Sequence, residues 1–310
     1  MRQFTIGGQT LRDGDPCYVI AEIGHNHGGD VETALQMIQA AAEAGADAVK
    51  FQTRDNATLY SRALLEQPYT GENSYGPTYG AHRAALELSA KAFADCRDMA
   101  NICGVACFST AFDEVSADAL VAARVPAIKL ASGSLRDFSL LTHVGSLGTP
   151  VILSTGGGTL GDIHKAVNTL VVAGCSNLAI LHCTAAYPVR DWSELNLRCI
   201  TTLREEYPEF VIGWSGHDSG IAMAVAAYTL GAGIIEKHFT LNRASKGTDH
   251  AFSLEPAGLT KLVRDLHRTY QALGDGVKRY YPSELGPISK MRRRQTPEGL
   301  RITGEQDVLA

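Results

Sequence analysis

The stretch VIGWSGHDSGIAMAVAAYTLGAGIIEKH, residues 211–238, decides the fold. Two apolar runs typical of β-strands, 210–215 (which begins one residue before the stretch) and 233–238, lie on either side of one helix-like segment. This spacing predicts two adjacent parallel strands joined by a helical crossover. Because His217 and His238 stand at the ends of these runs, we expect both imidazoles on the same rim of a parallel sheet.

The same strand–helix unit recurs along the whole chain. Strand-like runs lie near 17–22, 47–52, 105–109, 127–131, 150–154, 178–182, 210–215 and 233–238. Helical patterns follow near 31–44, 88–102, 114–123, 136–146, 160–173, 193–206, 219–230 and 256–273. Eight such units predict a closed (β/α)8 TIM barrel. The alternative is an open doubly wound sheet, but the first strand lacks the Gly-x-Gly-x-x-Gly turn that a dinucleotide-binding fold would carry.

Three segments fall outside this repeat. Residues 3–12 predict a hairpin that covers the bottom of the barrel, and residues 54–87 form a long insertion rich in Tyr, Gly, Pro and Asn. Insertions of this length are typical of active-site covers or flexible excursions. We therefore expect a barrel domain over 1–280 and a polar C-terminal tail or arm over 281–310.

The composition is ordinary for a soluble globular enzyme. Of the 310 residues 45% are hydrophobic and 20% are charged, and the net charge of -5 favours neither a nucleic acid nor a membrane surface as partner. The first residues do not have the pattern of a signal peptide, and no apolar run approaches the roughly 18 residues that span a bilayer. Seven scattered cysteines indicate reduced thiols, so we expect a cytoplasmic protein.

Polar residues at the carboxyl ends of the strands are the candidates for chemistry, because barrels of this class build their active sites there. His217 and His238 form a candidate metal site, since neutral imidazole is a common ligand of divalent transition metals. A pair of hydrogen-bonded histidines at strand ends is the alternative, and these two residues alone do not decide between them.

Two lysines in otherwise apolar strands predict an anion-binding pocket. Lys50 and Lys129 are expected to point inward, because a buried ammonium needs an anionic partner. Hydroxyl groups would join them from Thr110, Ser132, Ser154 and Ser215. Such a pocket suits a phosphate or a carboxylate, although either lysine alone could be a structural ion-pair partner. Strand alternation turns Lys237 away from this pocket.

Glu22 is the expected acid or base. It ends the first strand, and alternation points it inward, toward the lysines and the histidine pair. A salt bridge to Lys50 or Lys129 is the alternative interpretation. In the turn that follows, Asn26 is expected to contact substrate, whereas its neighbours His25 and His27 are expected to be merely solvated.

Together these motifs resemble the sialic acid (N-acetylneuraminate) synthase family from about residue 17 to 265. The motifs are Ala21-Glu-Ile-Gly-x-Asn-His27, Val49-Lys-x-Gln-Thr53, Phe108-Ser-Thr110, Leu153-Ser-Thr-Gly156, Leu181-His-Cys-Thr184 and Glu236-Lys-His-Phe-Thr240. Members of that family condense phosphoenolpyruvate with an N-acylated amino-sugar aldehyde, usually with Mn²⁺, and form a nine-carbon 2-keto-3-deoxy sugar acid of the nonulosonic type plus phosphate.

The resemblance implies a role for each candidate residue. It implies that His217 and His238 bind the metal, most often Mn²⁺, and that Glu22 is the acid/base. Phosphoenolpyruvate would be held by Lys50, Thr110, Lys129, Ser132, Ser154 and Ser215, with the two lysines stabilising charge during catalysis. Gln52, Tyr187 and Asp249 would face the sugar. The resemblance also implies a homodimer.

The chain departs from the family pattern at several positions. Ala185 replaces an Asn, Ser134 replaces a Glu, Gly216 replaces an Asp, and Lys246-Gly-Thr-Asp249 replaces Pro-Gly-Pro-Asp. The sequence ends where the family's C-terminal antifreeze-protein-like domain would begin, so we expect a truncated member without that domain. In the family this domain brings an Arg to the sugar's N-acyl group. The hypothesis is therefore a different aldehyde, or a site closed by the 54–87 insertion or the Arg292–Arg294 tail.

Three rival functions remain. A Schiff-base keto-acid aldolase would use Lys129 or Lys50 as nucleophile on a similar barrel. A synthase of seven- or eight-carbon phosphorylated sugar acids ranks lower, because the sequence offers no further basic cluster clearly suited to a second phosphate. A non-catalytic barrel that binds a sugar acid is the third.

Overall fold

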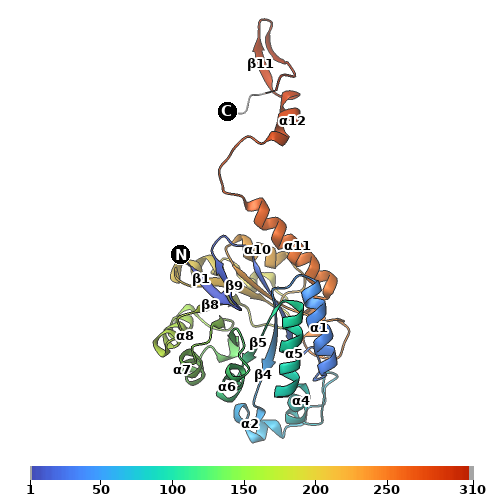
Figure 1. Cartoon of the computed structure of the whole chain (residues 1–310), viewed down its shortest axis with the longest axis vertical. Helices are drawn as coiled ribbons and strands as arrows, with labels where there is room; N and C mark the ends of the chain where they lie inside the picture. Colours follow the sequence, from blue (N-terminus) through green and yellow to red (C-terminus); the bar gives the residue numbers. More distant parts are fainter. Residues whose placement is uncertain (1, 307–310) are drawn as a thin grey trace. The chain divides into compact units, whose positions relative to one another are not determined.

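Eight parallel strands close into a barrel in the computed structural model, which describes residues 2–306 (Figure 1). The strands are β3 (Tyr18–Gly24), β4 (Ala48–Thr53), β5 (Ala106–Ala111), β6 (Ile128–Leu130), β7 (Val151–Ser154), β8 (Leu178–Cys183), β9 (Val211–Gly216) and β10 (Ile234–His238). Their order around the barrel follows the chain, and β10 pairs with β3 to close it. The predicted TIM barrel is confirmed, and the open sheet is excluded.

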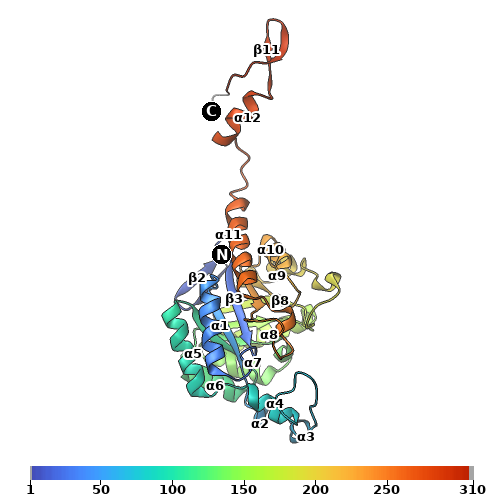
Figure 2. The same cartoon turned by 90° about the vertical axis from the view of Figure 1, so that its right-hand side faces the viewer.

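Helices form the outer layer around these strands (Figure 2). The main ones are α1 (Val31–Glu43), α5 (Ala90–Cys103), α6 (Glu114–Ala122), α7 (Phe138–Ser146), α8 (Leu160–Ala173), α9 (Cys199–Glu206), α10 (Ala222–Thr229) and α11 (Pro256–Leu273). The helix expected over 193–206 is divided, because a 3-10 turn, Trp192–Leu195, precedes α9 and ends at Asn196 in the left-handed conformation.

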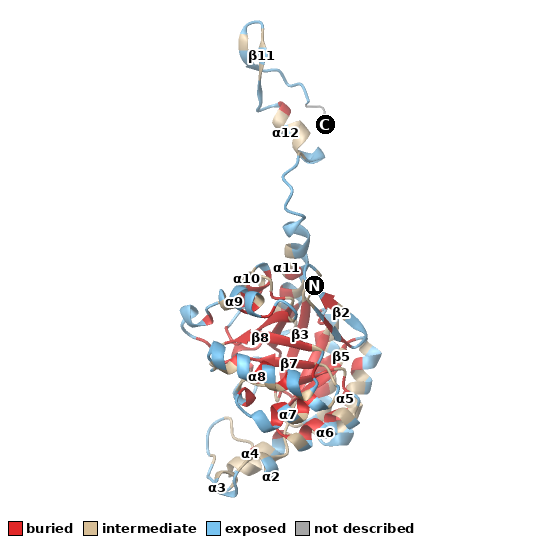
Figure 3. Ribbon diagram, turned by 90° about the vertical axis from the view of Figure 1, so that its left-hand side faces the viewer, coloured by how far each residue is buried: buried red, intermediate tan, exposed pale blue. Residues whose placement is uncertain are grey.

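The first helix shows how sequence sets these boundaries. The Asp30 side chain caps α1 by accepting the backbone N–H of Thr33. Ala34, Met37 and Ile38 lie one turn apart and are fully buried against the barrel. Figure 3 shows the same division throughout the barrel, with buried strands inside and helices exposed on their outer faces. Burial of the strands on both sides explains their continuous apolar runs.

The N-terminal hairpin and the insertion lie at opposite ends of the barrel (Figures 1 and 2). The hairpin pairs β1 (Gln3–Ile6) with β2 (Gln9–Arg12). It buries Phe4 and accepts a hydrogen bond from Asn177, just before β8, at the carbonyl of Thr5. The hairpin therefore covers the amino ends of the strands, as predicted. The insertion contains α2 (Asn56–Leu59), α3 (Arg62–Leu65) and α4 (Tyr79–Leu86) and leaves from the carboxyl end of β4.

The chain divides into two compact units, Met1–Tyr270 and Gln271–Ala310. Beyond the end of α11, the second unit holds a 3-10 turn (Pro282–Glu284), α12 (Leu285–Ser289) and an antiparallel hairpin of β11 (Arg293–Thr296) and β12 (Gly299–Ile302). The boundary predicted between 280 and 281 stays a prediction, and the end of the predicted tail, 307–310, lies outside the described residues. Within 2–306 no helix is long and apolar enough to cross a membrane.

Candidate active site

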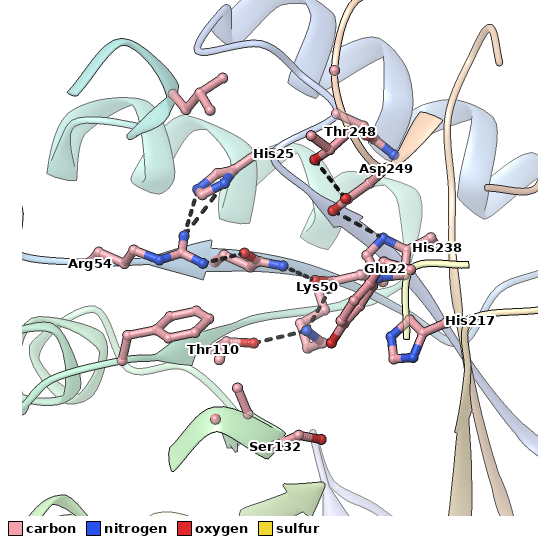
Figure 4. A pocket seen from close by; sticks show the side chains of 18 of the residues that line it. Glu22, His25, Lys50, Arg54, Thr110, Ser132, His217, His238, Thr248 and Asp249 are labelled. Atoms are coloured by element: carbon pink, nitrogen blue, oxygen red, sulfur yellow. Dashed lines mark hydrogen bonds and ion pairs between the residues drawn. The ribbon is translucent and has the colours of Figure 1, made fainter. Parts of the chain in front are cut away.

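A cavity of about 470 Å³ opens at the carboxyl end of the barrel. Its walls come from the strand ends, from the 54–87 insertion and from the loop after β10 (Figure 4). Every candidate residue from the sequence lines it: Glu22, Asn26, Lys50, Gln52, Thr110, Lys129, Ser132, Ser154, Tyr187, Ser215, His217, His238 and Asp249. The size is typical of small-molecule sites.

Lys50 and Glu22 meet on the cavity floor because β4 and β3 place them side by side in register. The Lys50 Nζ atom lies 2.6 Å from Glu22 Oε2 and donates a hydrogen bond to Thr110 Oγ1 at 2.8 Å. Both side chains are almost fully buried, yet both line the cavity. The alternative interpretation, a salt bridge to Lys50, is confirmed; the carboxylate also lines the cavity, and its role as acid or base stays a prediction.

Lys129 forms the second half of the floor together with Glu236. Its Nζ atom donates to Ser154 Oγ at 2.7 Å and lies 4.0 Å from Glu236 Oε1. Glu236 also accepts a hydrogen bond from Ser215 at 3.0 Å, and its other oxygen lies 3.9 Å from Lys50 Nζ. Burial raises the pKa of Glu236, but the attraction of Lys129 and Lys50 outweighs it and holds that pKa below its usual value. The floor thus alternates two ammonium groups with two carboxylates.

Glu236 was given no role from the sequence, although it shares its strand face with His238. Alternation along β10 was sufficient to predict that it points inward. Its ion-pair partners were not predictable, because they depend on strands about 100 to 190 residues away in the chain. Alternation did correctly exclude Lys237, which is buried outside the cavity with its Nζ atom 2.8 Å from Asp218 Oδ1.

The two candidate metal ligands lie next to each other, with ring centroids 5.3 Å apart. The Nδ1 atom of His217 faces the backbone carbonyl of Thr184 at 3.1 Å. Burial, and then the neighbouring His238, lower the pKa of His217 to about 3, so its ring is neutral near pH 7. The Nδ1 atom of His238 is buried without a hydrogen-bond partner among the described residues, 3.7 Å from Asp249 Oδ2. No cluster of three or more His, Cys, Asp or Glu side chains suited to a metal occurs within 2–306.

Three residues expected on the sugar side also lie on the cavity wall. Gln52 donates to Glu22 Oε1 at 2.9 Å, and the Tyr187 ring packs 4.3 Å from the ring of His217. Asp249 lies beside His238 on the loop after β10 (Figure 4). Burial raises the pKa of Asp249, but the attraction of His238 and other partners lowers it by more. The pKa of Asp249 is therefore below its usual value.

Asn26 has a structural task on the same wall. Its amide nitrogen donates to the carbonyl of Phe239 at 2.8 Å and to Ser253 Oγ at 3.0 Å. These bonds join the turn after β3 to the loop after β10. The expected contact with substrate stays a prediction.

The expectation that His25 and His27 are merely solvated is wrong. His27 is 2% exposed, packs against Phe51 and accepts the backbone N–H of Gly29. His25 lies 3.2 Å from Glu87 and 3.0 Å from Arg54 Nη1 and lines the cavity. The turn is held down because the insertion folds over it, which the sequence of the turn alone did not indicate.

The insertion supplies cavity residues that the sequence did not single out. They are Arg54, Tyr69, Asn73, Tyr75, His82, Arg83 and Leu86. Irregular segments carry no periodicity from which their inward faces could be predicted. Arg54 is the one of these residues that the sequence could have indicated, because it follows the end of β4 directly. The insertion lines the cavity, and its closing of the site stays a prediction.

Comparison with known proteins assigns the barrel to one enzyme family. The NeuB family profile matches residues 37–278. The human N-acetylneuraminate-9-phosphate synthase is 37% identical over 303 residues, which is 96% of this chain and 82% of that protein. The N,N'-diacetyllegionaminic acid synthase of Legionella pneumophila is 36% identical, covering 94% of this chain and 85% of that protein. The crystal structure of an N-acetylneuraminic acid (sialic acid) synthetase from Leptospira borgpetersenii, in complex with citrate, superimposes with a TM-score of 0.80 and 33% identity, over 91% of this chain and 94% of that one.

Proposed function

This chain belongs to the NeuB family, and from that premise we propose how its cavity performs the reaction. The protein is a transferase that condenses phosphoenolpyruvate with a sugar aldehyde to give a nonulosonic-type sugar acid. One observation carries the assignment of roles: two ammonium groups and two imidazoles open onto one cavity.

Phosphoenolpyruvate binds on the floor, between Lys50 and Lys129. Each ammonium group already holds a hydroxyl, Thr110 Oγ1 or Ser154 Oγ, at hydrogen-bond distance. Ser132 and Ser215 extend this wall, and Ser132 Oγ accepts the backbone N–H of Gly156 at 2.9 Å. A Cβ atom at Gly156 would approach Ser132 Oγ to 2.7 Å, so glycine is needed for this close contact. Charge-assisted hydrogen bonds from such donors suit a phosphate and a carboxylate.

His217 and His238 bind the metal, which we propose is Mn²⁺. The donor set fits, because His217 is held neutral by burial and His238 presents a buried ring nitrogen that lacks a hydrogen-bond partner among the described residues. Two side chains leave coordination positions for substrate or water. A divalent metal bound there would supply Lewis-acid polarisation of the aldehyde oxygen.

In the reaction, C3 of phosphoenolpyruvate forms a bond to the aldehyde carbon. Water then adds at C2, the C–O bond to the phosphate breaks, and inorganic phosphate leaves. The attacking water loses both of its protons: one ends on the aldehyde oxygen, which becomes a hydroxyl, and the other leaves with the phosphate when the C2 hydroxyl becomes the ketone carbonyl. Glu22 lies between Lys50 and Gln52 and is placed to transfer these protons, while Lys50 and Lys129 stabilise charge on the phosphate and carboxylate.

The acceptor is an N-acylmannosamine-like aldose or a related one, and it lies on the wall formed by Gln52, Tyr187 and Asp249. Ala185 and Ser134 replace larger polar residues of the family pattern, and Ala185 lines the cavity. The insertion closes the outer part of the site. A different aldehyde from N-acetylmannosamine is consistent with these changes.

Phosphate release from phosphoenolpyruvate, measured against a panel of aldoses with Mn²⁺, tests this function. We expect release that depends on the aldose and stops with a chelator. Activity strictly limited to N-acetylmannosamine would reject the altered acceptor. Borohydride trapping of a keto acid on Lys129 or Lys50, with full activity in chelator, would establish the aldolase instead. Absence of turnover with every aldose would favour a binding barrel.

The cellular compartment and the oligomeric state of the enzyme are also proposals. All seven cysteines are free and four of them are buried, which suits a reducing compartment such as the cytoplasm. The homodimer rests on the family resemblance. Light scattering of the purified protein measures it directly.

A further inference from the structure

A buried ion pair lies outside the cavity, next to both candidate metal ligands along the chain. We call it the back pair and define it as Lys237 and Asp218. Lys237 directly precedes His238 in the sequence, and Asp218 directly follows His217. Each side chain of the back pair is 1% exposed, and neither residue lines the cavity. The pair is therefore joined to each histidine through one peptide bond and not through the cavity.

The back pair holds β9 and β10 together where their backbone pairing ends. The two strands stay in register up to Lys237 and Gly216, and His217 lies one residue beyond that point. There the Lys237 Nζ atom donates to the backbone carbonyl of Asp218 at 2.6 Å and to Oδ1 of the same residue at 2.8 Å. A side chain thus fixes the segment after β9 against the end of β10.

The Trp214 ring is a second contact of the ammonium group. Trp214 is fully buried, and its ring centroid lies 5.5 Å from the Lys237 Nζ atom. The ring packs on the backbone of Gly216, where a Cβ atom would lie 2.0 Å from a ring carbon. A side chain at this position would therefore displace the ring. Because Gly216 replaces the Asp of the family pattern, this packing is a feature of the present chain.

The two imidazoles of the histidine pair are held unequally. The His217 ring faces the carbonyl of Thr184 at 3.1 Å, whereas the Nδ1 atom of His238 has no hydrogen-bond partner among the described residues. The distance between the rings therefore depends on how the end of β9 lies against β10. Metal–imidazole bonds are about 2 Å long and tolerate deviations of about 0.2 Å. A small displacement of one histidine is thus sufficient to weaken a shared metal site.

We propose that Lys237 is a positioning residue, which sets the spacing of His217 and His238 and thereby the affinity of this pair for a divalent metal ion. The inference rests on the proposed function, which assigns the metal to the two histidines. Groups that hold metal ligands in place from behind typically contribute about 10 to 100-fold to metal affinity. A purely stabilising ion pair would instead change the free energy of unfolding and leave the metal affinity of the folded protein unchanged.

Replacement of both members of the back pair tests this role without leaving a charge buried alone. Lys237→Met combined with Asp218→Asn removes both charges, whereas Lys237→Met by itself would leave an unpaired carboxylate. Asp218→Asn alone is the matched variant, because Lys237 can still donate to the backbone carbonyl of residue 218. Leu120→Ala is the control for lost stability, since Leu120 is buried in α6, which follows β5, four places around the barrel from β9.

Electron paramagnetic resonance of free Mn²⁺, titrated with the metal-depleted full chain, measures the dissociation constant of each protein. Circular dichroism at the same temperature checks that each variant is folded. We expect K237M/D218N to bind Mn²⁺ at least about 10-fold more weakly than wild type, and D218N and L120A to stay within about threefold of it. Gly216→Ala, whose Cβ atom displaces the Trp214 ring from the ammonium group, replaces the double variant if that protein does not fold. It should weaken Mn²⁺ binding by at least about threefold.

The outcomes separate this inference from the proposed function. Equal dissociation constants in wild type and the folded variants overturn the positioning role and leave the condensation intact. So does a loss of affinity in L120A as large as that in K237M/D218N, because the effect then follows stability alone. A wild-type protein that binds no Mn²⁺ overturns the metal site itself, and the inference with it.

Discussion

The charges on the cavity floor compensate one another in pairs. Lys50 contacts Glu22 at 2.6 Å, and Lys129 lies 4.0 Å from Glu236. Either ammonium group alone would be expensive to bury, and a broken pair would leave an uncompensated charge. The arrangement sets two ammonium groups against two carboxylates on the wall of the cavity.

Glu22→Gln tests the proton-transfer role. The amide keeps the size of the side chain and an oxygen that can accept from Gln52, but it removes the proton acceptor. We expect kcat to fall by about 10² to 10⁴-fold, the usual contribution of a general acid or base. Phosphate release under saturating substrates measures kcat, and calorimetry measures phosphoenolpyruvate binding, which should weaken much less. A kcat within threefold of wild type would remove Glu22 from the chemistry.

At the level of residues, the sequence predicted which way a side chain points better than which residue it contacts. Alternation placed Lys50 and Lys129 inward and Lys237 outward, because the side-chain period of a strand is fixed. It gave no information on which carboxylate faces which ammonium group. Glu236 and Arg54 were therefore not assigned, since their partners depend on packing between distant segments.

At the level of elements, the insertion is attached to the barrel at defined points. Tyr75 Oη donates to the carbonyl of Lys246 at 2.6 Å, and Asn73 Oδ1 accepts the N–H of Gly247 at 3.0 Å. Both partners lie in the loop that carries Asp249. These two hydrogen bonds join the insertion to the loop that faces His238.

Gly29→Ala tests this docking. Gly29 has φ +82°, and a Cβ atom there would lie 1.9 Å from the carbonyl oxygen of Ala85 in α4. We expect a loss of at least about 2 kcal/mol in the free energy of unfolding, from backbone strain and displacement of α4. Urea denaturation measures this loss, and the KM for the acceptor should rise more than the KM for phosphoenolpyruvate.

Gly71→Ala is the control for that substitution. Gly71 lies in the same insertion, and a Cβ atom there meets nothing within 4 Å. It should leave both the stability and the kinetics unchanged. Equal effects of the two substitutions would mean that α4 does not depend on the close approach at Gly29.

The elements themselves were predictable where the pattern was long and regular. Each strand of the barrel was placed to within one or two residues at either end, because buried parallel strands read as continuous apolar runs. The helix expected over 193–206 was not placed correctly. Asp191 caps a short 3-10 turn there, and Asn196 adopts the left-handed conformation before α9 begins. The short helices of the insertion are too brief for a periodic pattern.

At the level of the whole molecule, the barrel gathers the ends of all eight strands at one mouth. This topology explains why Glu22 and His238, more than 200 residues apart in the chain, are cross-strand partners. The motifs were scattered along the sequence, but their positions relative to the strands were sufficient to predict one shared site.

The pH dependence of stability tests the packing around the turn after β3. Burial is the main cause that lowers the pKa of His27 to about 4, below the value of about 6.5 in an unfolded chain. The unfolded state therefore binds more protons between these values, and stability falls as the pH drops through that window. From pH 7 to pH 5 this one group should lower the free energy of unfolding by about 2 kcal/mol.

Urea denaturation of His27→Gln at both pH values measures that contribution. The variant should lose less stability on acidification than wild type. His164→Gln is the control, because His164 is 47% exposed and lies outside the cavity. An identical pH dependence in wild type and H27Q would show that His27 is not held neutral.

The most direct test of the reaction uses phosphoenolpyruvate that carries ¹⁸O in the bridge between C2 and phosphorus. The purified protein is incubated with this phosphoenolpyruvate, Mn²⁺ and N-acetylmannosamine or its 6-phosphate. Mass spectrometry then measures the masses of the products. We expect the label to leave with inorganic phosphate, one labelled phosphate for each 2-keto acid formed, because the C–O bond breaks. Label retained in the keto acid, or phosphate release that does not depend on the sugar, would contradict it.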